Sequence, residues 1–262
     1  WLNRQEWSFK MFFVLAVVLR LILLFASPEL SNDFYRFIWD GELINMGINP
    51  YGHTPNDLIS QGPIYEDQYM RMLWHGMGEL SQANYSCYPA LNQFLFYLPT
   101  KFFDSIGANV ISFKIMMILA DIGIIIVGKR ILEHLKKSKH LIWLFALNPF
   151  IILEFSGNLH FEGVMIFFML LAIYLILKDY WLLAGGIFGL AILVKLIPLL
   201  LLPFLYKHLK FIKAIGFTAM TGIIVILMSL IFLDQSMFDN MMESINLYFV
   251  NFEFNASIIF LL

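Results

Sequence analysis

The sequence predicts an all-α polytopic membrane protein, and three observations support this fold class. Of the 262 residues, 60% are hydrophobic, and the mean hydropathy is +0.76. Only 14% are charged, against roughly a quarter in soluble proteins. Apolar runs alternate with polar stretches along the chain, as in helices that cross a bilayer. We expect a single integral membrane domain over residues 1–262, present as a fragment that is truncated at both ends.

The apolar runs define eight or nine hydrophobic segments. Their predicted bounds are 10–27, 88–103, 106–128, 139–155, 160–177, 180–194, 196–206, 211–233 and 255 onward. A helix needs about 20 apolar residues to span the hydrocarbon core. Several segments fall short of that length, so we expect some of them to be short or re-entrant.

The charges between the segments predict how the chain is oriented. The stretch 129–140 contains five Lys and Arg residues with one acid, and 207–213 contains three Lys with none. Because cytoplasmic loops are enriched in Lys and Arg, we place both in the cytoplasm. The stretch 29–87 contains two Lys and Arg residues with eight acids, which predicts a large first extracytoplasmic loop. We expect an integral protein of the cell (inner) membrane.

This orientation identifies two segments that do not cross. Segment 106–128 must return to the cytoplasm, so 88–103 is expected to be a short helix or hairpin within the outer leaflet, broken near Pro99. Segment 196–206 is also too short, because eleven residues of helix cover only about 16 Å. We therefore expect a helix break at Lys195, whose side chain lies in a water-lined cavity below the outer surface.

Six ionisable residues lie in or beside apolar segments: Arg20, Lys114, Asp121, Glu154, Glu162 and Lys195. Charges are costly at membrane depth, so each is expected to face a partner or a cavity. Lys114 and Asp121 are seven residues apart and share a helix face, which favours a structural pair or snorkelling. A role for Arg20 in packing and a role in function remain equally open.

Polar residues at two places near the outer ends of the apolar segments suggest ligand contacts. Lys195, a cation beside a helix break, suits a phosphate group. His160 and Glu162 are two residues apart, which is weak spacing for a metal site. The single cysteine, Cys87, excludes an internal disulfide and a cysteine-based metal site.

The loop after the first segment is acidic and aromatic, SNDFYRFIWDGELINMGINPY from Ser31 to Tyr51. If it begins with a helix, Asp33, Arg36 and Asp40 share one face. A carboxylate at an apolar boundary can act as a general base. The alternative is an acidic helix end that only caps and solvates the chain.

This loop resembles the first outer loop of polyprenyl-phosphate-mannose-dependent mannosyltransferases with the C-type glycosyltransferase (GT-C) membrane fold. The matching residues are Asp33, Tyr35-Arg36-Phe37, Trp39-Asp40-Gly41 and Asn49-Pro50-Tyr51. Four later elements resemble the family in the expected order: CYPALNQ (87–93), ALNPFIILEFSGNLHFEG (146–163), LAGGIFGLAILVKLIPLLLLPFLY (183–206) and FEFNASIIF (252–260). Ala90 stands where the family usually has Pro, and Ser31 stands where some relatives have a first Asp.

The resemblance implies a GT-C-like helical bundle that transfers a hexose, mannose in this family, with inversion at the extracytoplasmic face. It implies a polyprenyl-phosphate sugar donor in the membrane lipid, a glycolipid or glycan acceptor, and no nucleic acid. It makes Asp33 the catalytic base, with Asp40 as the alternative. The substrate-binding residues that it implies are Lys195, Arg36, Tyr35, Trp39, Tyr51, Asn158, His160 and Glu162.

No cofactor and no metal site are expected, since Ser31 weakens the case for a divalent cation. Two other classes of function remain open at this point. One is a lipid or sugar transporter or flippase, which also uses charges and broken helices in the membrane. The other is a non-catalytic subunit of a glycosylation complex.

Overall fold

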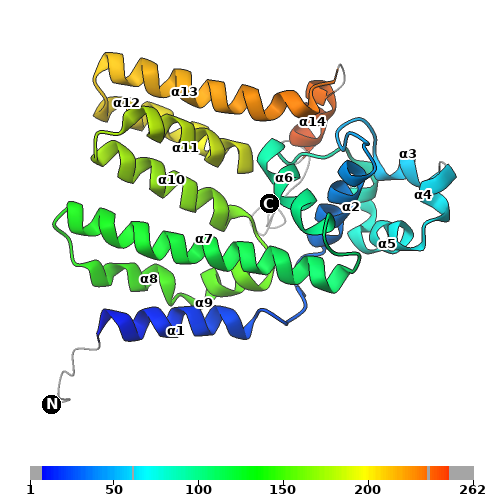
Figure 1. Ribbon diagram of the computed structural model, residues 1–262, viewed down its shortest axis with the longest axis horizontal. Helices are drawn as coiled ribbons and strands as arrows, with labels where there is room; N and C mark the ends of the chain where they lie inside the picture. Colours follow the sequence, from blue (N-terminus) through cyan, green and yellow to red (C-terminus); the bar gives the residue numbers. More distant parts are fainter. Residues whose placement is uncertain (1–7, 61, 235–236, 248–262) are drawn as a thin grey trace, which may run out of the picture.

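The computed structural model describes residues 8–60, 62–234 and 237–247, and every regular element in that part of the chain is a helix. Long helices lie side by side and form the body of the molecule (Figure 1). They are α1 (Phe9–Ile22), α7 (Ile106–His134), α10 (Glu162–Leu177), α11 (Trp181–Val194) and α13 (Phe211–Ser229). The predicted segment from 255 onward and the element at 252–260 lie outside the described residues.

Short helices complete the bundle between the long ones. The chain after α7 continues through η1 (Lys139–Ile142), α8 (Trp143–Ala146), α9 (Pro149–Ile151) and η2 (Ile152–Gly157). After α11 it returns through η3 (Ile197–Leu201) and α12 (Leu202–His208), and η4 (Leu230–Phe232) extends α13. The break after α11 confirms the turn that was expected at Lys195.

Two helices among the described residues are long and apolar enough to cross a membrane, Ile106–His134 and Phe211–Phe232. The bent pair Lys139–Ala146 and Pro149–Gly157, with an angle of 57°, would make a third span. Three apolar helices are shorter, Glu162–Leu177, Trp181–Val194 and Ile197–His208. The all-α polytopic class is therefore confirmed. The chain is an integral membrane protein in which some apolar helices are long enough to cross a membrane and others are shorter.

The loop after α1 folds into a helical lobe at one end of the bundle (Figure 1, right). The lobe consists of α2 (Asp33–Asn45), α3 (Pro55–Ile59), α4 (Gly62–Glu66), α5 (Gln68–Ala83) and α6 (Ala90–Thr100), and α14 (Met237–Asn246) lies against it. Helix α6 has only 11 residues, so segment 88–103 forms a short helix, as expected. Stacked rings of Phe37 and Phe96 pack on Phe113 of α7, so the lobe and the bundle share one hydrophobic core.

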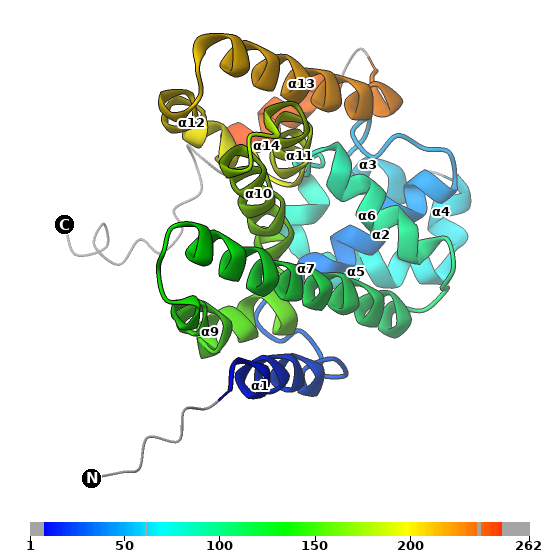
Figure 2. The ribbon, with the colours of Figure 1, turned by 60° about the vertical axis from the view of Figure 1, so that its left-hand side comes forward.

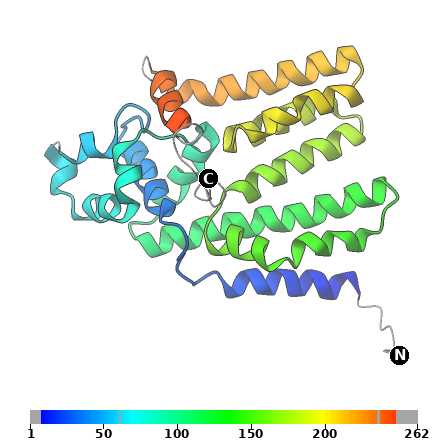
Figure 3. The ribbon, with the colours of Figure 1, turned by 180° about the vertical axis from the view of Figure 1, so that it is seen from behind.

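The basic stretches gather at the opposite end of the bundle. The turns that follow α7, α10 and α12 all lie at the end far from the lobe, and the reverse view agrees (Figures 1 and 3). Lys136, Lys137, Lys178 and Lys210 lie in these turns. The basic turns thus lie at one end of the bundle and the acidic lobe lies at the other. This is expected if successive helices run in opposite directions, as the sequence predicted.

Buried charges hold α1 to the bundle, at whose edge it lies (Figure 2). The Arg20 Nε lies 2.7 Å from Asp121 Oδ2, and both side chains are fully buried. The Arg20 Nη1 also donates to the carbonyl of Ala146 at 2.9 Å. Of the two readings expected for Lys114, a structural pair with Asp121 or snorkelling, the pair does not form. The Lys114 Nζ instead donates to the carbonyl of Leu23 at 2.7 Å, because seven residues of helix separate the two charges by about 10 Å.

Candidate active site

Asp33 is the first residue of α2, and its side chain is half-buried. Its backbone N–H donates to the Ser31 Oγ at 3.2 Å, which closes the turn that starts the helix. The first turn of a helix favours a negative charge, because the unpaired N–H groups there carry partial positive charge. The local sequence therefore holds the Asp33 carboxylate at a partly exposed helix N-terminus.

Asp40 lies two turns further along α2 and is fully buried. Its Oδ1 accepts from Arg36 Nε at 2.7 Å, and its Oδ2 accepts from Ser86 Oγ at 2.6 Å and from Gln93 Nε2 at 2.9 Å. Both carboxylate oxygens are therefore occupied by protein donors. In this structure Asp40 has no surface through which a substrate hydroxyl could reach it.

Arg36 is also part of the lobe's interior rather than its surface. Its Nη1 donates to the carbonyls of Ser81 at 2.7 Å and Asn84 at 2.9 Å. Burial opposes its charge, but the adjacent Asp40 carboxylate outweighs that effect and raises the pKa of Arg36. The guanidinium fixes the end of α5 against α2, so it is not available here to a substrate phosphate.

Two aromatic residues expected to stack on sugars are buried in the core. Trp39 and Tyr51 are both 0% exposed. The Tyr51 hydroxyl donates to the carbonyl of Tyr88 at 2.6 Å, and its own carbonyl accepts from Asn240 Nδ2 at 2.9 Å. Neither ring offers a face to a ligand in this structure, because each is packed inside a hydrophobic cluster that includes residues of the bundle. Tyr35 differs, since it is half-buried and borders an open groove.

The hairpin between η2 and α10 has an unusual backbone. Residues Ile152–Gly157 form a π-helix, and Leu159 has a φ of 64° although it is fully buried. Both features are energetically unfavourable and concentrate at functional sites. They turn the chain so that His160 Nδ1 lies 3.0 Å from Glu154 Oε2.

Asn158 connects this hairpin to the segment that leads into α2. Its Oδ1 accepts from the backbone N–H of Leu30 at 3.4 Å, and its side chain is largely buried. Asn158 therefore positions the chain three residues before Asp33. A direct role for Asn158 in binding substrate stays a prediction.

Lys195 lies at the helix break, in extended backbone at the end of α11. Its ammonium forms an ion pair with the Glu162 carboxylate at the start of α10. The two side chains are 37% and 32% exposed, so the pair faces solvent. Asn92 of α6 donates to the carbonyl of Val194 at 2.8 Å, which fixes the end of α11 beneath Lys195.

Ring contacts show how these elements meet. Phe37, one turn after Asp33, lies on the same helix face. Its ring centroid is 5.3 Å from that of Phe161, the residue between His160 and Glu162. Phe34, Phe37, Phe161 and Val194 belong to one hydrophobic cluster. We call the residues that border this cluster the polar rim: Asp33, Glu154, Asn158, His160, Glu162 and Lys195.

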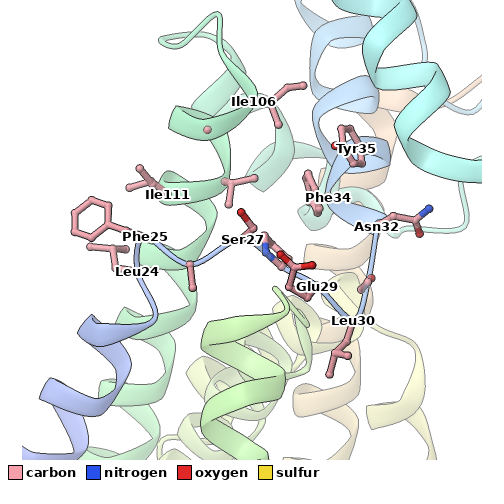
Figure 4. A pocket seen from close by; sticks show the side chains of 15 residues that line it. Leu24, Phe25, Ser27, Glu29, Leu30, Asn32, Phe34, Tyr35, Ile106 and Ile111 are labelled. Carbon is pink, nitrogen blue, oxygen red and sulfur yellow. The ribbon is translucent and has the colours of Figure 1, made fainter.

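An open groove lies beside α2, between the chain leading into it and the first turns of α7 (Figure 4). Its volume is about 640 Å³. Ser31, Asn32 and Tyr35 border it next to Asp33, while Phe25 and Ile111 form an apolar wall. Because Asp33 and Tyr35 leave α2 on different sides, the groove flanks the polar rim without containing the Asp33 carboxylate.

Three polar residues of the site were not predicted as site residues, namely Ser86, Asn92 and Gln93. The element CYPALNQ, which matched the family pattern, contains two of them, and this is the signal that could have identified them. Their role is positional, since they fix Asp40 and the end of α11. Among the described residues, no group of three His, Cys, Asp or Glu side chains could hold a metal ion.

A family model described as "Alpha-(1->6)-mannopyranosyltransferase, N-terminal domain" matches residues 2–210. The chain belongs to this family. The match confirms the resemblance to a mannosyltransferase-like family that the loop and hairpin residues suggested. It covers α1, the lobe, the hairpin and Lys195, so all the residues of the polar rim lie within the family's domain.

One curated relative is named alpha-(1->6)-mannopyranosyltransferase A and comes from Corynebacterium glutamicum. It is 24% identical over 187 residues, which cover 70% of this chain and 35% of the relative. The chain thus spans about a third of the length of the relative it matches. No solved structure matches the chain.

Proposed function

We propose that this chain carries the catalytic loop of a glycosyltransferase. In this proposal the enzyme transfers mannose from a polyprenyl-phosphate donor to a hydroxyl of a glycolipid or glycan acceptor, at the extracytoplasmic membrane face. The observation that carries the proposal is the different placement of the two candidate acids. Asp33 belongs to the polar rim and is partly exposed at a helix N-terminus, while Asp40 is buried and accepts hydrogen bonds at both carboxylate oxygens.

Asp33 acts as the general base in this mechanism. Its carboxylate takes the proton from an acceptor hydroxyl as that oxygen attacks the anomeric carbon of the sugar. The bond between the anomeric carbon and the phosphate oxygen breaks, and its electron pair leaves with the lipid phosphate. Since attack and departure occur on opposite faces of an oxocarbenium-like transition state, the anomeric centre inverts.

Lys195 stabilises the departing phosphate. Its ammonium is partly exposed and is held at the helix break by Glu162, so an approaching phosphate competes with that carboxylate for the same cation. A cation aimed at developing negative charge lowers the barrier of such a step. His160 and Tyr35, both partly exposed, are the remaining candidates for contacts with sugar hydroxyls and sugar faces.

The groove beside α2 supports access from the bilayer. Its apolar wall includes Phe25, which is 80% exposed, and its rim includes Leu30, which is 77% exposed. Ser31 and Asn32 border the same groove. A lipid-linked substrate could therefore keep its chain against apolar side chains while its polar group reaches the start of α2.

The test uses the full-length protein with radiolabelled polyprenyl-phosphate mannose and a membrane lipid extract. Asp33→Asn should lower transfer by roughly two to four orders of magnitude with the fold intact, since a general base contributes about 10²–10⁴-fold. Lys195→Ala should also lower the maximal rate. Glu66→Gln on the exposed α4 is the matched control and should leave transfer unchanged. Transfer that survives Asp33→Asn would overturn the base assignment, and no transfer by the wild type would favour a transporter or a non-catalytic subunit.

A further inference from the structure

A second pocket lies at the basic end of the bundle, between the first turns of α1 and the last turns of α7. Its volume is about 510 Å³. Four of the residues that line it are apolar, and four are charged: Phe9, Phe13, Ile125, Ile126, Lys10, Lys129, Arg130 and Glu133. It is therefore an apolar pocket with a charged border, at the opposite end of the molecule from the polar rim.

The charges at this pocket are unbalanced. Of the described residues that line it, three are cations and one is an acid. The pair between Lys129 Nζ and Glu133 Oε1 spans 3.9 Å, and the two side chains are 34% and 48% exposed. Glu133 offsets one of the three cations, so the residues that line the pocket keep a net positive charge.

Aromatic contacts bring two ammonium groups close to the pocket from different elements. The Nζ of Lys129 lies 4.7 Å from the ring centroid of Phe9, and the Nζ of Lys139 lies 5.7 Å from the same centroid. Each contact is favourable by itself, but the two like charges repel each other. An anion bound between them would relieve that repulsion, so the arrangement points to an anionic ligand.

The depth of the pocket indicates where this anion comes from. Helix α7 has 29 residues, which corresponds to about 43 Å, while the hydrocarbon core is about 30 Å thick. The last turns of α7 therefore extend to the level of the lipid headgroups. Below the cations, Val14 and Val18 of α1 and Ile126 of α7 are 51%, 44% and 43% exposed, and these apolar side chains face lipid.

We propose that this pocket binds an anionic phospholipid. Its phosphate lies among Lys10, Lys129 and Arg130, and an acyl chain follows Phe13 and Ile126 toward the bilayer centre. Basic pockets between transmembrane helices on the cytoplasmic side bind anionic lipid headgroups in this way. A free phosphate would use the cations but not the apolar floor, so the combination of both favours a lipid.

The test measures lipid retention by the purified full-length protein with native mass spectrometry. Phosphatidylglycerol should be retained and phosphatidylcholine should not, and soluble glycerol phosphate should not displace the bound lipid. The double variant Lys129→Gln/Arg130→Gln should lower retention of phosphatidylglycerol about tenfold or more, since each basic residue near a membrane surface contributes substantially to anionic lipid binding. The control Lys136→Gln/Lys137→Gln changes the same net charge in the turn after α7, outside the pocket lining, and should have an effect of about threefold or less.

Three results would overturn the proposal. Equal retention of the two phospholipids would show that the pocket does not select an anion. Equal losses in the two double variants would show that only general surface charge acts. Displacement by glycerol phosphate at comparable concentration would show an anion site without a lipid. If the double variant does not fold, the single variant Arg130→Gln and the wild-type comparison of the two lipids decide the matter.

Discussion

Arg36 and Asp40 form a buried ion pair one helical turn apart on α2, with Arg36 Nε 2.7 Å from Asp40 Oδ1. The pair connects three segments of the lobe, because Arg36 also donates to Ser81 and Asn84 while Asp40 accepts from Ser86. These contacts hold the chain that joins α5 to α6 against α2. The pair therefore determines the position of the helix whose first residue is Asp33.

Replacing Asp40 with Asn should destabilise the lobe. The substitution leaves the buried Arg36 guanidinium without its counter-charge, and breaking a buried pair costs about 3–5 kcal/mol. Limited proteolysis should then cut within 33–88 at lower protease concentration, and thermal unfolding should begin earlier. Asp33→Asn is the matched control, because Asp33 is accessible and should leave the proteolysis pattern unchanged. Equal protection of the two variants would contradict this division of roles.

The Arg20–Asp121 pair yields a second prediction, within the membrane bundle. Arg20→Met leaves Asp121 buried and unpaired, and should lower the free energy of unfolding by about 3 kcal/mol. The double variant Arg20→Met/Asp121→Leu removes both charges and should recover much of that loss. Thermal unfolding in detergent across the four proteins of this double-mutant cycle measures the coupling. Additive losses would show that the two residues do not stabilise each other.

Close packing of α11 on α13 yields a third prediction. A Cβ atom at Gly185 would lie 2.3 Å from the backbone carbonyl oxygen of Phe217, whereas a Cβ at Gly222 would meet nothing within 4 Å. Gly185→Ala should therefore force the helices apart and cost about 1–3 kcal/mol. Gly222→Ala is the control on the facing helix and should be neutral or stabilising, because Ala favours helix over Gly by up to about 1 kcal/mol. Similar unfolding temperatures for both variants would contradict the packing.

Hydrophobicity and charge were sufficient to predict the arrangement of the bundle. The segments, the short helix α6 and the break at Lys195 follow from segment length and from the placement of Lys and Arg, and these are properties of the bilayer as a solvent. The Arg20–Asp121 pair was not predicted, because periodicity gives only the face of a helix. It does not show which neighbouring helix that face meets, so the sequence could not identify the carbonyls just after α1 as the partners of Lys114.

The candidate site was predicted less completely than the fold. Trp39 and Tyr51 were expected to bind substrate, because the family resemblance implies that role. Trp39 is instead buried in the core that the lobe shares with α7 and α10, and Tyr51 packs with Leu193 of α11 and Phe232 of η4. These contacts become visible only when the helices are packed together. The ion pair of Glu162 with Lys195 joins residues 33 positions apart, and no local pattern in the sequence encodes it.

Cys87 provides a direct probe of Asp33 because it is the only cysteine in the chain. Burial raises the pKa of the Cys87 thiol to about 11, and the negative charges of Asp40 and Asp33 add to this effect against the opposing Arg36. The thiolate is the reactive form, so alkylation should be slow at neutral pH. Asp33→Asn removes one of those negative charges, which lowers the pKa and increases the thiolate fraction at a given pH. Alkylation of the folded protein should therefore be faster in Asp33→Asn, with its pH profile displaced toward lower pH.

The control for this experiment is Asp57→Asn, since Asp57 is exposed in α3 and does not contribute to the pKa of Cys87. Its alkylation profile should match the wild type. A profile that rises in Asp33→Asn without moving along the pH axis would indicate greater exposure of the thiol rather than loss of a nearby charge. An unchanged profile in Asp33→Asn would place the Asp33 carboxylate too far from Cys87 to act on it, and would argue against an aspartate directed toward the polar rim.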